Sequence, residues 1–173
     1  MAENNIEKVI TSREVEEEIQ KAEKEGRPAN FEGKTIESIH LAGKKISVPL
    51  KFPRATIKGN LDLGGTTMKG TLDLFGATIG GNLDLGRTTI EENLWLQRAI
   101  IKGNLGLRGA VIREGIYLEE AIIEGSLYLG GLKYKQLYAD FSVAVAAHLS
   151  RQSNIIVPPS KIDDFFHPSE EKK

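Results

Sequence analysis

The chain contains no cysteine, which excludes a disulfide framework and any metal site built from thiolates. It also lacks an apolar run near the roughly 20 residues that a membrane-spanning helix needs. The chain also has no large excess of either charge, because 24 acidic and 23 basic residues leave a net charge of -1. This balance gives neither nucleic acid nor an anionic membrane an electrostatic reason to bind.

A targeting signal is a further absence. The polar start Met1-Ala2-Glu3-Asn4-Asn5 lacks the basic and then apolar pattern of a signal peptide. We therefore expect a cytoplasmic protein.

What the chain does have is an eleven-residue period, kept by three series of apolar residues. The first series is Ile57, Met68, Ile79, Ile90, Ile101, Ile112 and Ile123. The second is Leu61, Leu72, Leu83, Leu94, Leu105, Ile116 and Leu127. The third is Leu63, Leu74, Leu85, Leu96, Leu107, Leu118 and Leu129. A fixed period kept over seven units indicates a repeat architecture.

Each unit contains two short apolar pairs, such as Ala55-x-Ile57 and Leu61-x-Leu63. Alternation at period two places both members of a pair on one side of a strand. Turn residues such as Gly64 and Gly65 separate the pairs. So short a strand needs neighbours above and below it, and coiling of the chain supplies both. The sequence therefore predicts an all-β solenoid of stacked parallel strands.

Small residues indicate how long one coil is. Alanine recurs every 22 residues, at Ala55, Ala77, Ala99 and Ala121, and alternates with Thr66, Thr88 and Ala110. Asparagine recurs at the same interval, at Asn60, Asn82 and Asn104. Two units therefore make one four-sided coil of about 22 residues, and we expect the stacked asparagines to hydrogen-bond along the axis.

The stretch Ala77-Thr-Ile-Gly-Gly-Asn-Leu-Asp-Leu-Gly86 resembles pentapeptide-repeat proteins. The central apolar residues of the resemblance are Ile57, Leu63, Met68, Leu74, Ile79 and Leu85, so the steps alternate six and five. It covers about residues 39–131 and implies a right-handed four-sided parallel β-helix. Strict five-residue units are absent, which is where this chain departs from the family.

A helix is expected to cap each end of the β-helix, because open strand edges invite aggregation. We assign residues 1–30 to an N-terminal capping helix segment. Thr11 or Ser12 can cap this helix, Glu14 stands three residues after Thr11 as in a capping box, and Gly26 can end the helix. Residues 31–132 form the repeat domain, and residues 133–152 a C-terminal α-helix that covers the last coil or contacts a second copy. Residues 153–173 are an extended tail.

The candidate partner-binding residues are six aromatic side chains and one valine. Trp95, Tyr117 and Tyr128 occupy outward positions of the Leu-x-Leu pairs, and the others lie on the expected C-terminal helix. The full candidate set is Trp95, Tyr117, Tyr128, Tyr134, Tyr138, Phe141 and Val145. Exposed aromatic residues on a rigid face are typical of interfaces. Two readings stay open, a contact within or between copies of this chain and a contact with a different protein.

Candidate metal ligands are few. Asp62 and Asp84 should project from one face, where stacked carboxylates could hold calcium or simply face solvent. The histidines His40, His148 and His167 lack ligand spacing. We therefore predict no catalytic residue, no metal and no cofactor.

The sequence favours a non-catalytic scaffold or protein-interaction module that forms a homo-oligomer through its C-terminal region, with any other protein partner unidentified. One alternative is a β-helix enzyme acting on a carbohydrate or an acyl group, although the eleven-residue period fits the known enzyme coils poorly. Another is a filament-forming subunit, which the expected caps argue against.

Overall fold

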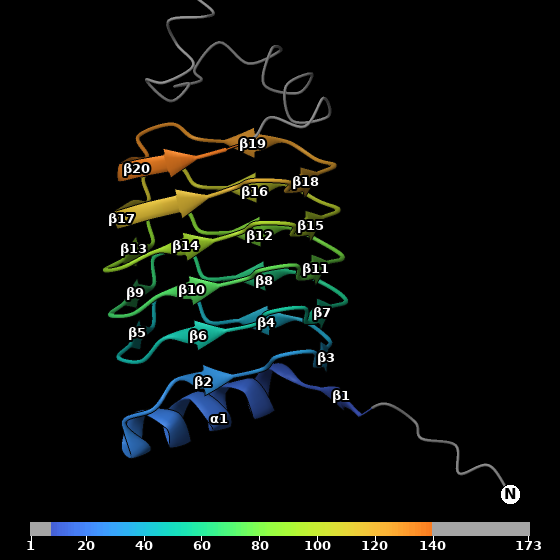
Figure 1. Cartoon of the computed structure of the whole chain (residues 1–173). Coiled ribbons are helices and arrows are strands. Elements are labelled where there is room, and N and C mark those ends of the chain that lie inside the picture. The colour runs from blue at the N-terminus through green and yellow to red at the C-terminus, as the bar shows by residue number, and fades with distance from the viewer. Residues whose placement is uncertain (1–7, 140–173) are drawn as a thin grey trace, which may run out of the picture.

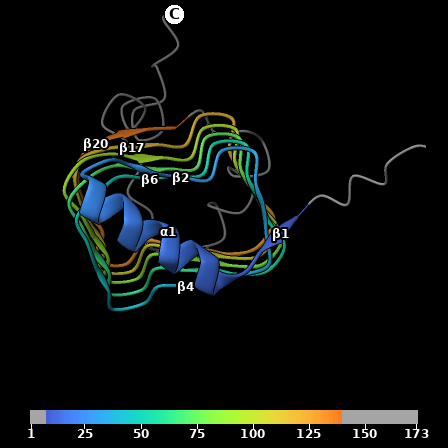
Figure 2. The same cartoon turned by 90° about the horizontal axis from the view of Figure 1, so that it is seen from below.

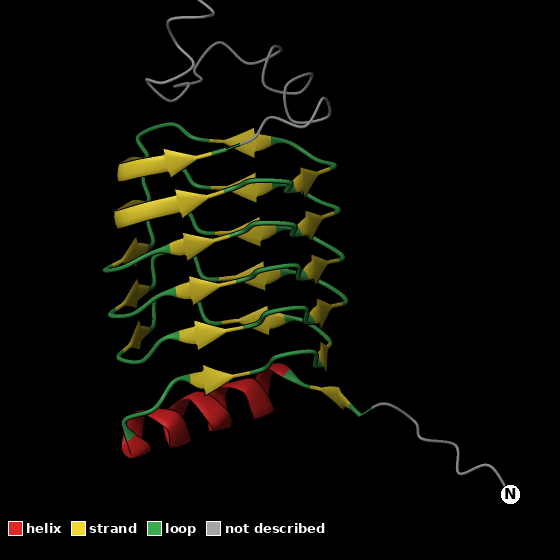
Figure 3. Ribbon diagram, viewed as in Figure 1, coloured by secondary structure: helices red, strands yellow, loops and turns green. Residues whose placement is uncertain are grey.

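A computed structural model describes residues 8–139 of the chain. Within this range the protein is a stack of short parallel strands with a helix at one end (Figures 1 and 3). The helix is α1 (Ser12–Glu25), and it lies across the first coil (Figure 2).

The strands form three parallel sheets. Sheet A contains β1 (Val9–Ile10), β3 (Thr35–Ile36), β7 (Thr56–Ile57), β11 (Thr78–Ile79), β15 (Ile100–Ile101) and β18 (Ile122–Ile123). Sheet C contains β4 (Ile39–His40), β8 (Leu61–Asp62), β12 (Leu83–Asp84), β16 (Leu105–Gly106) and β19 (Leu127–Tyr128).

Sheet B covers two sides of the coil. One side contains β2 (Ala29–Asn30), β6 (Leu50–Lys51), β10 (Leu72–Asp73) and β14 (Leu94–Trp95). The other contains β5 (Lys45–Ile46), β9 (Thr67–Met68) and β13 (Thr89–Ile90). The two sides join at β17 (Val111–Tyr117), which turns the corner and pairs with β20 (Lys133–Tyr138).

Strand pairing confirms the predicted length of the coil. Leu83 pairs with Leu61 on one side and Leu105 on the other, each 22 residues away. The same offset holds on the other sides, as Leu72 with Leu94 and Ile79 with Ile101 show. Each such coil carries four short strands, for example β7, β8, β9 and β10.

The core is the column of inward aliphatic side chains that the repeat predicted. Ile57, Leu61 and Leu63 are all fully buried, and so are their equivalents through the middle coils. Fully burying a side chain of this size contributes roughly 1.5–3 kcal/mol. In the last coil Leu118 and Leu129 are only partly buried, because they lie at the end of the stack.

Two polar side chains in the core have partners along the axis. The Thr66 hydroxyl donates to the carbonyl of Leu41 at 3.0 Å, and the Thr88 hydroxyl donates to the carbonyl of Leu63 at 2.7 Å. Both threonines are fully buried, and a buried hydroxyl without such a bond would be costly.

The expected asparagine ladder is present at one corner. The backbone N–H of Asn82 donates to Asn60 Oδ1 at 2.8 Å, and that of Asn104 donates to Asn82 Oδ1 at 2.8 Å. Ser126 continues the ladder by donating to Asn104 Oδ1 at 2.6 Å. Each side chain thus serves the backbone of the next coil.

The N-terminal helix matches its prediction. Thr11 and Glu14 form the capping box, and Gly26 ends the helix in the left-handed conformation with φ of 64°. Val15, Ile19 and Ala22 are buried against the solenoid. Polar groups of α1 also serve the edge of the neighbouring coil, since Glu23 Oε1 accepts from the Ser47 N–H at 2.8 Å.

The C-terminal helix is a correction. Residues 133–138, expected to begin it, form strand β20 instead. The open edge of β17 offers unpaired backbone groups, and Ile112 pairs with Tyr134 at the repeat offset of 22 residues. The rest of the predicted helix, with Phe141 and Val145, lies outside the described residues, and so does the predicted tail.

Candidate functional site

Three aromatic rings form a column on the outer face of sheet B. We call Trp95, Tyr117 and Tyr138 the aromatic column. They come from the neighbouring strands β14, β17 and β20, in which Trp95 pairs with Tyr117 and Tyr117 with Tyr138. The Trp95 and Tyr117 rings meet edge to face with centroids 6.2 Å apart, and the Tyr117 and Tyr138 rings stack at 4.7 Å.

The strand pattern explains why these rings face outward. In β14 the side chain of Leu94 is fully buried, so the next residue, Trp95, points to the opposite side and is 40% exposed. Tyr138 is also 40% exposed, and Tyr117 lies half-buried between the two. The same outward position in the coils nearer α1 holds Asp73 and Lys51. The face thus changes from charged to aromatic toward β20.

A glycine shapes the middle of the column. A Cβ atom at Gly115 would lie 2.7 Å from Cε2 of Tyr117, closer than side chains tolerate. Gly115 therefore lets the Tyr117 ring lie close to its own strand. At the end of the column, the Tyr138 hydroxyl donates to Gln136 Oε1 at 2.8 Å.

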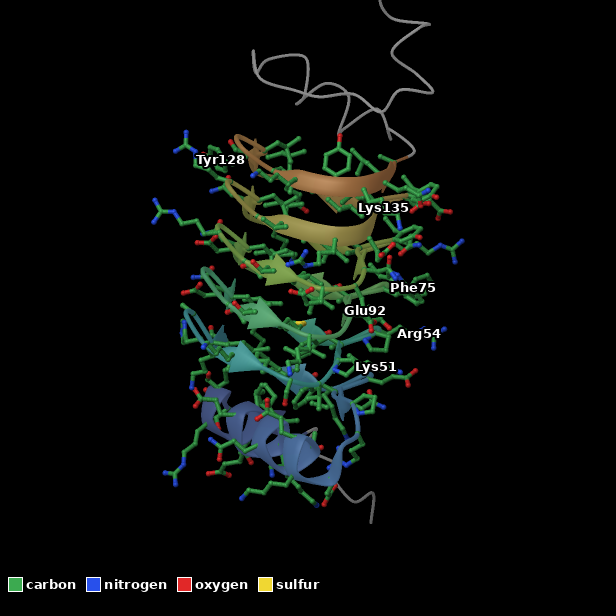
Figure 4. All side chains as sticks on the ribbon, turned by 90° about the vertical axis from the view of Figure 1, so that its left-hand side faces the viewer. Lys51, Arg54, Phe75, Glu92, Tyr128 and Lys135 are labelled. Carbon is green, nitrogen blue, oxygen red and sulfur yellow. The ribbon has the colours of Figure 1, made fainter. Side chains whose placement is uncertain are left out.

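The structure separates the remaining candidate residues. Tyr128 lies on sheet C, 47% exposed and away from the column, near the β20 end of the solenoid (Figure 4). Tyr134 is partly buried and packs against the core. Phe141 and Val145 lie outside the described residues.

Sequence reasoning missed the contact between Tyr117 and Tyr138. These residues are 21 apart, because the register of β20 shifts by one residue where β17 turns between Ile112 and Gly115. The available signal was the offset of 22 from Ile112 to Tyr134, which extends the repeat one coil further.

The aspartates of the repeat have a local structural task. Oδ1 of Asp62 accepts from the Gly64 N–H at 3.0 Å, and Oδ1 of Asp84 accepts from the Gly86 N–H at 2.8 Å. Asp73 makes the same bond to the Phe75 N–H at 3.0 Å. These are side-chain bonds that close turns. No group of three potential metal-ligating residues occurs within residues 8–139.

Charged residues form ion pairs between adjacent coils. Arg98 Nε lies 2.9 Å from Glu120 Oε2, and Lys135 Nζ of β20 lies 2.8 Å from Glu114 Oε2 of β17. Arg54 and Glu32 make a longer pair at 3.6 Å. The side chains in these pairs are about half exposed or more, so each pair contributes little to stability.

The only helix in residues 8–139, α1, is too short and too polar to cross a bilayer. Comparison of the chain with protein-family models, curated proteins and solved structures gave no match.

Proposed function

We propose that the chain is a non-catalytic scaffold or protein-interaction module of the pentapeptide-repeat-like type, and that the aromatic column joins two copies into a homodimer. The proposed fold is the right-handed four-sided β-helix of that family, supported by the four strands of each coil. The proposed setting is the cytoplasm.

The observation that carries this proposal is the aromatic column itself. Trp and Tyr supply much of the binding energy at protein interfaces because their large rings exclude water. Here the Tyr117 and Tyr138 rings are already stacked and the Trp95 ring meets Tyr117 edge to face, so little side-chain entropy remains to be lost on binding. A preordered aromatic face on a rigid sheet is well suited to contact another protein.

A second copy is the partner that the charge pattern favours. A twofold interface brings the same patch of both chains together, so a patch with one dominant charge would repel itself. The chain carries a net charge of only -1, and Glu114 of β17 is paired with Lys135 of β20, on two strands that also carry rings of the column. Two columns can therefore approach without strong repulsion.

The opposite end of the solenoid supports a closed assembly over a filament. Open-ended stacking would require the first coil to expose its core and strand edges. Val15, Ile19 and Ala22 of α1 cover that end instead. A twofold contact through the outer face of sheet B, in contrast, uses the same patch on both copies, so the assembly ends at a dimer.

Sedimentation velocity of wild type and Trp95→Ala over a concentration series tests the proposal. We expect the wild type to form a dimer and the variant to dissociate about tenfold or more readily, as loss of a large aromatic anchor at an interface does. Trp95 is the only tryptophan, so its emission should shift to the red when the wild-type dimer is diluted.

Ile122→Ala is the matched control, because Ile122 is a large apolar residue of sheet A with a similar exposure of 41%. This variant should dimerise like the wild type. A monomeric wild type at all concentrations, or equal weakening by both substitutions, would refute the role of the column.

A further inference from the structure

A groove on sheet C is a second surface with the properties of a site. Its volume is about 450 Å³, within the range of roughly 300–1,000 Å³ common for small-ligand pockets. Asp84 and Tyr128 lie on either side of Gly106, and Arg87 and Arg108 line the groove with them. Asn82 and Asn104 of the asparagine ladder complete its polar lining.

The hollow arises from one missing side chain. Asp84 pairs with Gly106, and Gly106 pairs with Tyr128, so these three residues occupy successive outward positions of one column. Gly106 has no side chain, and strand backbone therefore forms the floor between the Asp84 carboxylate and the Tyr128 ring. A Cβ atom there would lie 3.2 Å from Asp84 Oδ1, so any larger residue would occupy the groove.

The groove presents acceptors and donors in a fixed arrangement. Asp84 Oδ1 is held by the Gly86 N–H, which leaves Oδ2 to accept from a ligand. The Asn82 and Asn104 amide oxygens are used within the ladder, which leaves their NH₂ groups as donors. Arg87 lies 3.5 Å from a Cβ atom built at Gly109, so its side chain extends along the axis toward the next coil.

We propose that this groove binds a short saccharide, with the sugar ring against Tyr128 and its hydroxyl groups hydrogen-bonded to Asp84, Arg87 and Arg108. The exposed tyrosine ring offers an apolar face for the C–H groups of a sugar. Each hydroxyl group of a sugar can both donate and accept a hydrogen bond. Neighbouring sugar hydroxyls can therefore donate to the Asp84 carboxylate and accept from the guanidinium groups of Arg87 and Arg108.

Charge in the groove disfavours the other classes of small ligand. The two arginines repel a cation, and the Asp84 carboxylate repels a compact polyanion such as phosphate. A polyhydroxylated ligand avoids both penalties. This inference is independent of the proposed dimer, because the groove lies on sheet C and the aromatic column on sheet B.

Titration of the ¹⁵N-labelled full chain with cellobiose, maltose and lactose, followed by NMR, tests the proposal. We expect at least one of these sugars to give saturable shifts centred on β12, β16 and β19. Tyr128→Ala should weaken that binding at least tenfold. Trp95→Ala, on the other sheet, should bind like the wild type.

Gly106→Thr separates binding from folding. Its side chain should fill the groove and abolish saccharide binding. Threonine suits a strand better than glycine, which offsets the small shift that its Cβ atom imposes on Asp84, so the melting temperature should change little. Absence of saturable shifts with all three sugars would overturn the proposal. So would equal binding of inorganic phosphate, which would indicate a simple anion site at the arginines.

Discussion

At the scale of single residues, one turn position recurs around the solenoid with a left-handed backbone. In the turn that begins at Leu63, the Thr66 N–H bonds to the Leu63 carbonyl at 3.0 Å, and Gly65 between them has φ of 69°. Glycine adopts this conformation readily. The equivalent position elsewhere is occupied by Arg54, Arg87, Arg98 or Glu120, with φ of 56° to 59°. Such side chains are strained there.

Arg54→Gly should therefore stabilise the protein. The left-handed conformation costs a non-glycine residue about 1–2 kcal/mol, and the extra flexibility of unfolded glycine returns about 0.5–1 kcal/mol of this. The exposed pair of Arg54 with Glu32 adds little to the wild type. We expect the free energy of unfolding in urea to rise by roughly 0.5–1 kcal/mol.

Lys51→Gly is the matched control for Arg54→Gly. Lys51 is also exposed, but it lies in strand β6 and its φ is not positive. Glycine should destabilise the protein there. Two substitutions that shift the unfolding midpoint in the same direction would contradict the argument from backbone strain.

At the scale of elements, the start of α1 depends on the charge of Glu14. A hydrogen bond from Lys8, with further bonds from the backbone and hydroxyl of Thr11, lowers the pKa of Glu14 from 4.5 to about 2. The folded state therefore favours the carboxylate. Its stabilising effect is complete above pH 4.5 and is lost as the pH falls toward 2.

Glu14→Gln tests this linkage. The variant keeps a side chain that can complete the capping box but has no charge for Lys8. We expect it to melt at a lower temperature than the wild type at pH 7. The difference should shrink below pH 4.5 and close near pH 2. A difference that is independent of pH would contradict a role for the charge, and Glu17→Gln on the same helix serves as the control.

The elements differ in how well the sequence predicts them. The inward Leu and Ile positions and the capping box of α1 were predicted because a few neighbouring residues determine each. Strand β20 was not, because the spacing of Tyr134 and Tyr138 suits a helix face as well as a strand that turns a corner. The open edge of β17, a tertiary feature, favours the strand.

The same limit applies to the two surfaces. The outward direction of Trp95 and Tyr117 follows from strand alternation, so these residues were predicted. The stacking of Tyr138 depends on a one-residue register shift in β17 that spacing does not indicate. The groove depends on the absence of a side chain at Gly106, flanked in space by residues that are far apart in the chain.

At the scale of the whole molecule, the stability of the solenoid should add up coil by coil. Deletion of residues 66–87 removes one coil and joins Gly65 to Thr88, which occupies the same buried position as Thr66. We expect the shortened chain to fold cooperatively, with a smaller free energy of unfolding and a smaller urea m-value, because less surface is buried.

Circular dichroism and urea unfolding of the deletion variant, compared with the wild type, check this expectation. Loss of the β-sheet spectrum, or broad non-cooperative unfolding, would show that the coils depend on one another beyond their immediate neighbours. Preserved Trp95 emission would show that the aromatic column survives the deletion.

The offset of 22 residues between paired strands also sets how such a protein can change its length. Duplicating or losing one whole coil of 22 residues moves the two ends apart or together by about 4.8 Å and leaves both ends intact. The spacing between α1 and the Trp95 surface is therefore adjustable in equal increments. Insertion or deletion of a whole coil in the gene therefore changes the distance between α1 and the Trp95 surface and leaves the sequence of both ends unchanged.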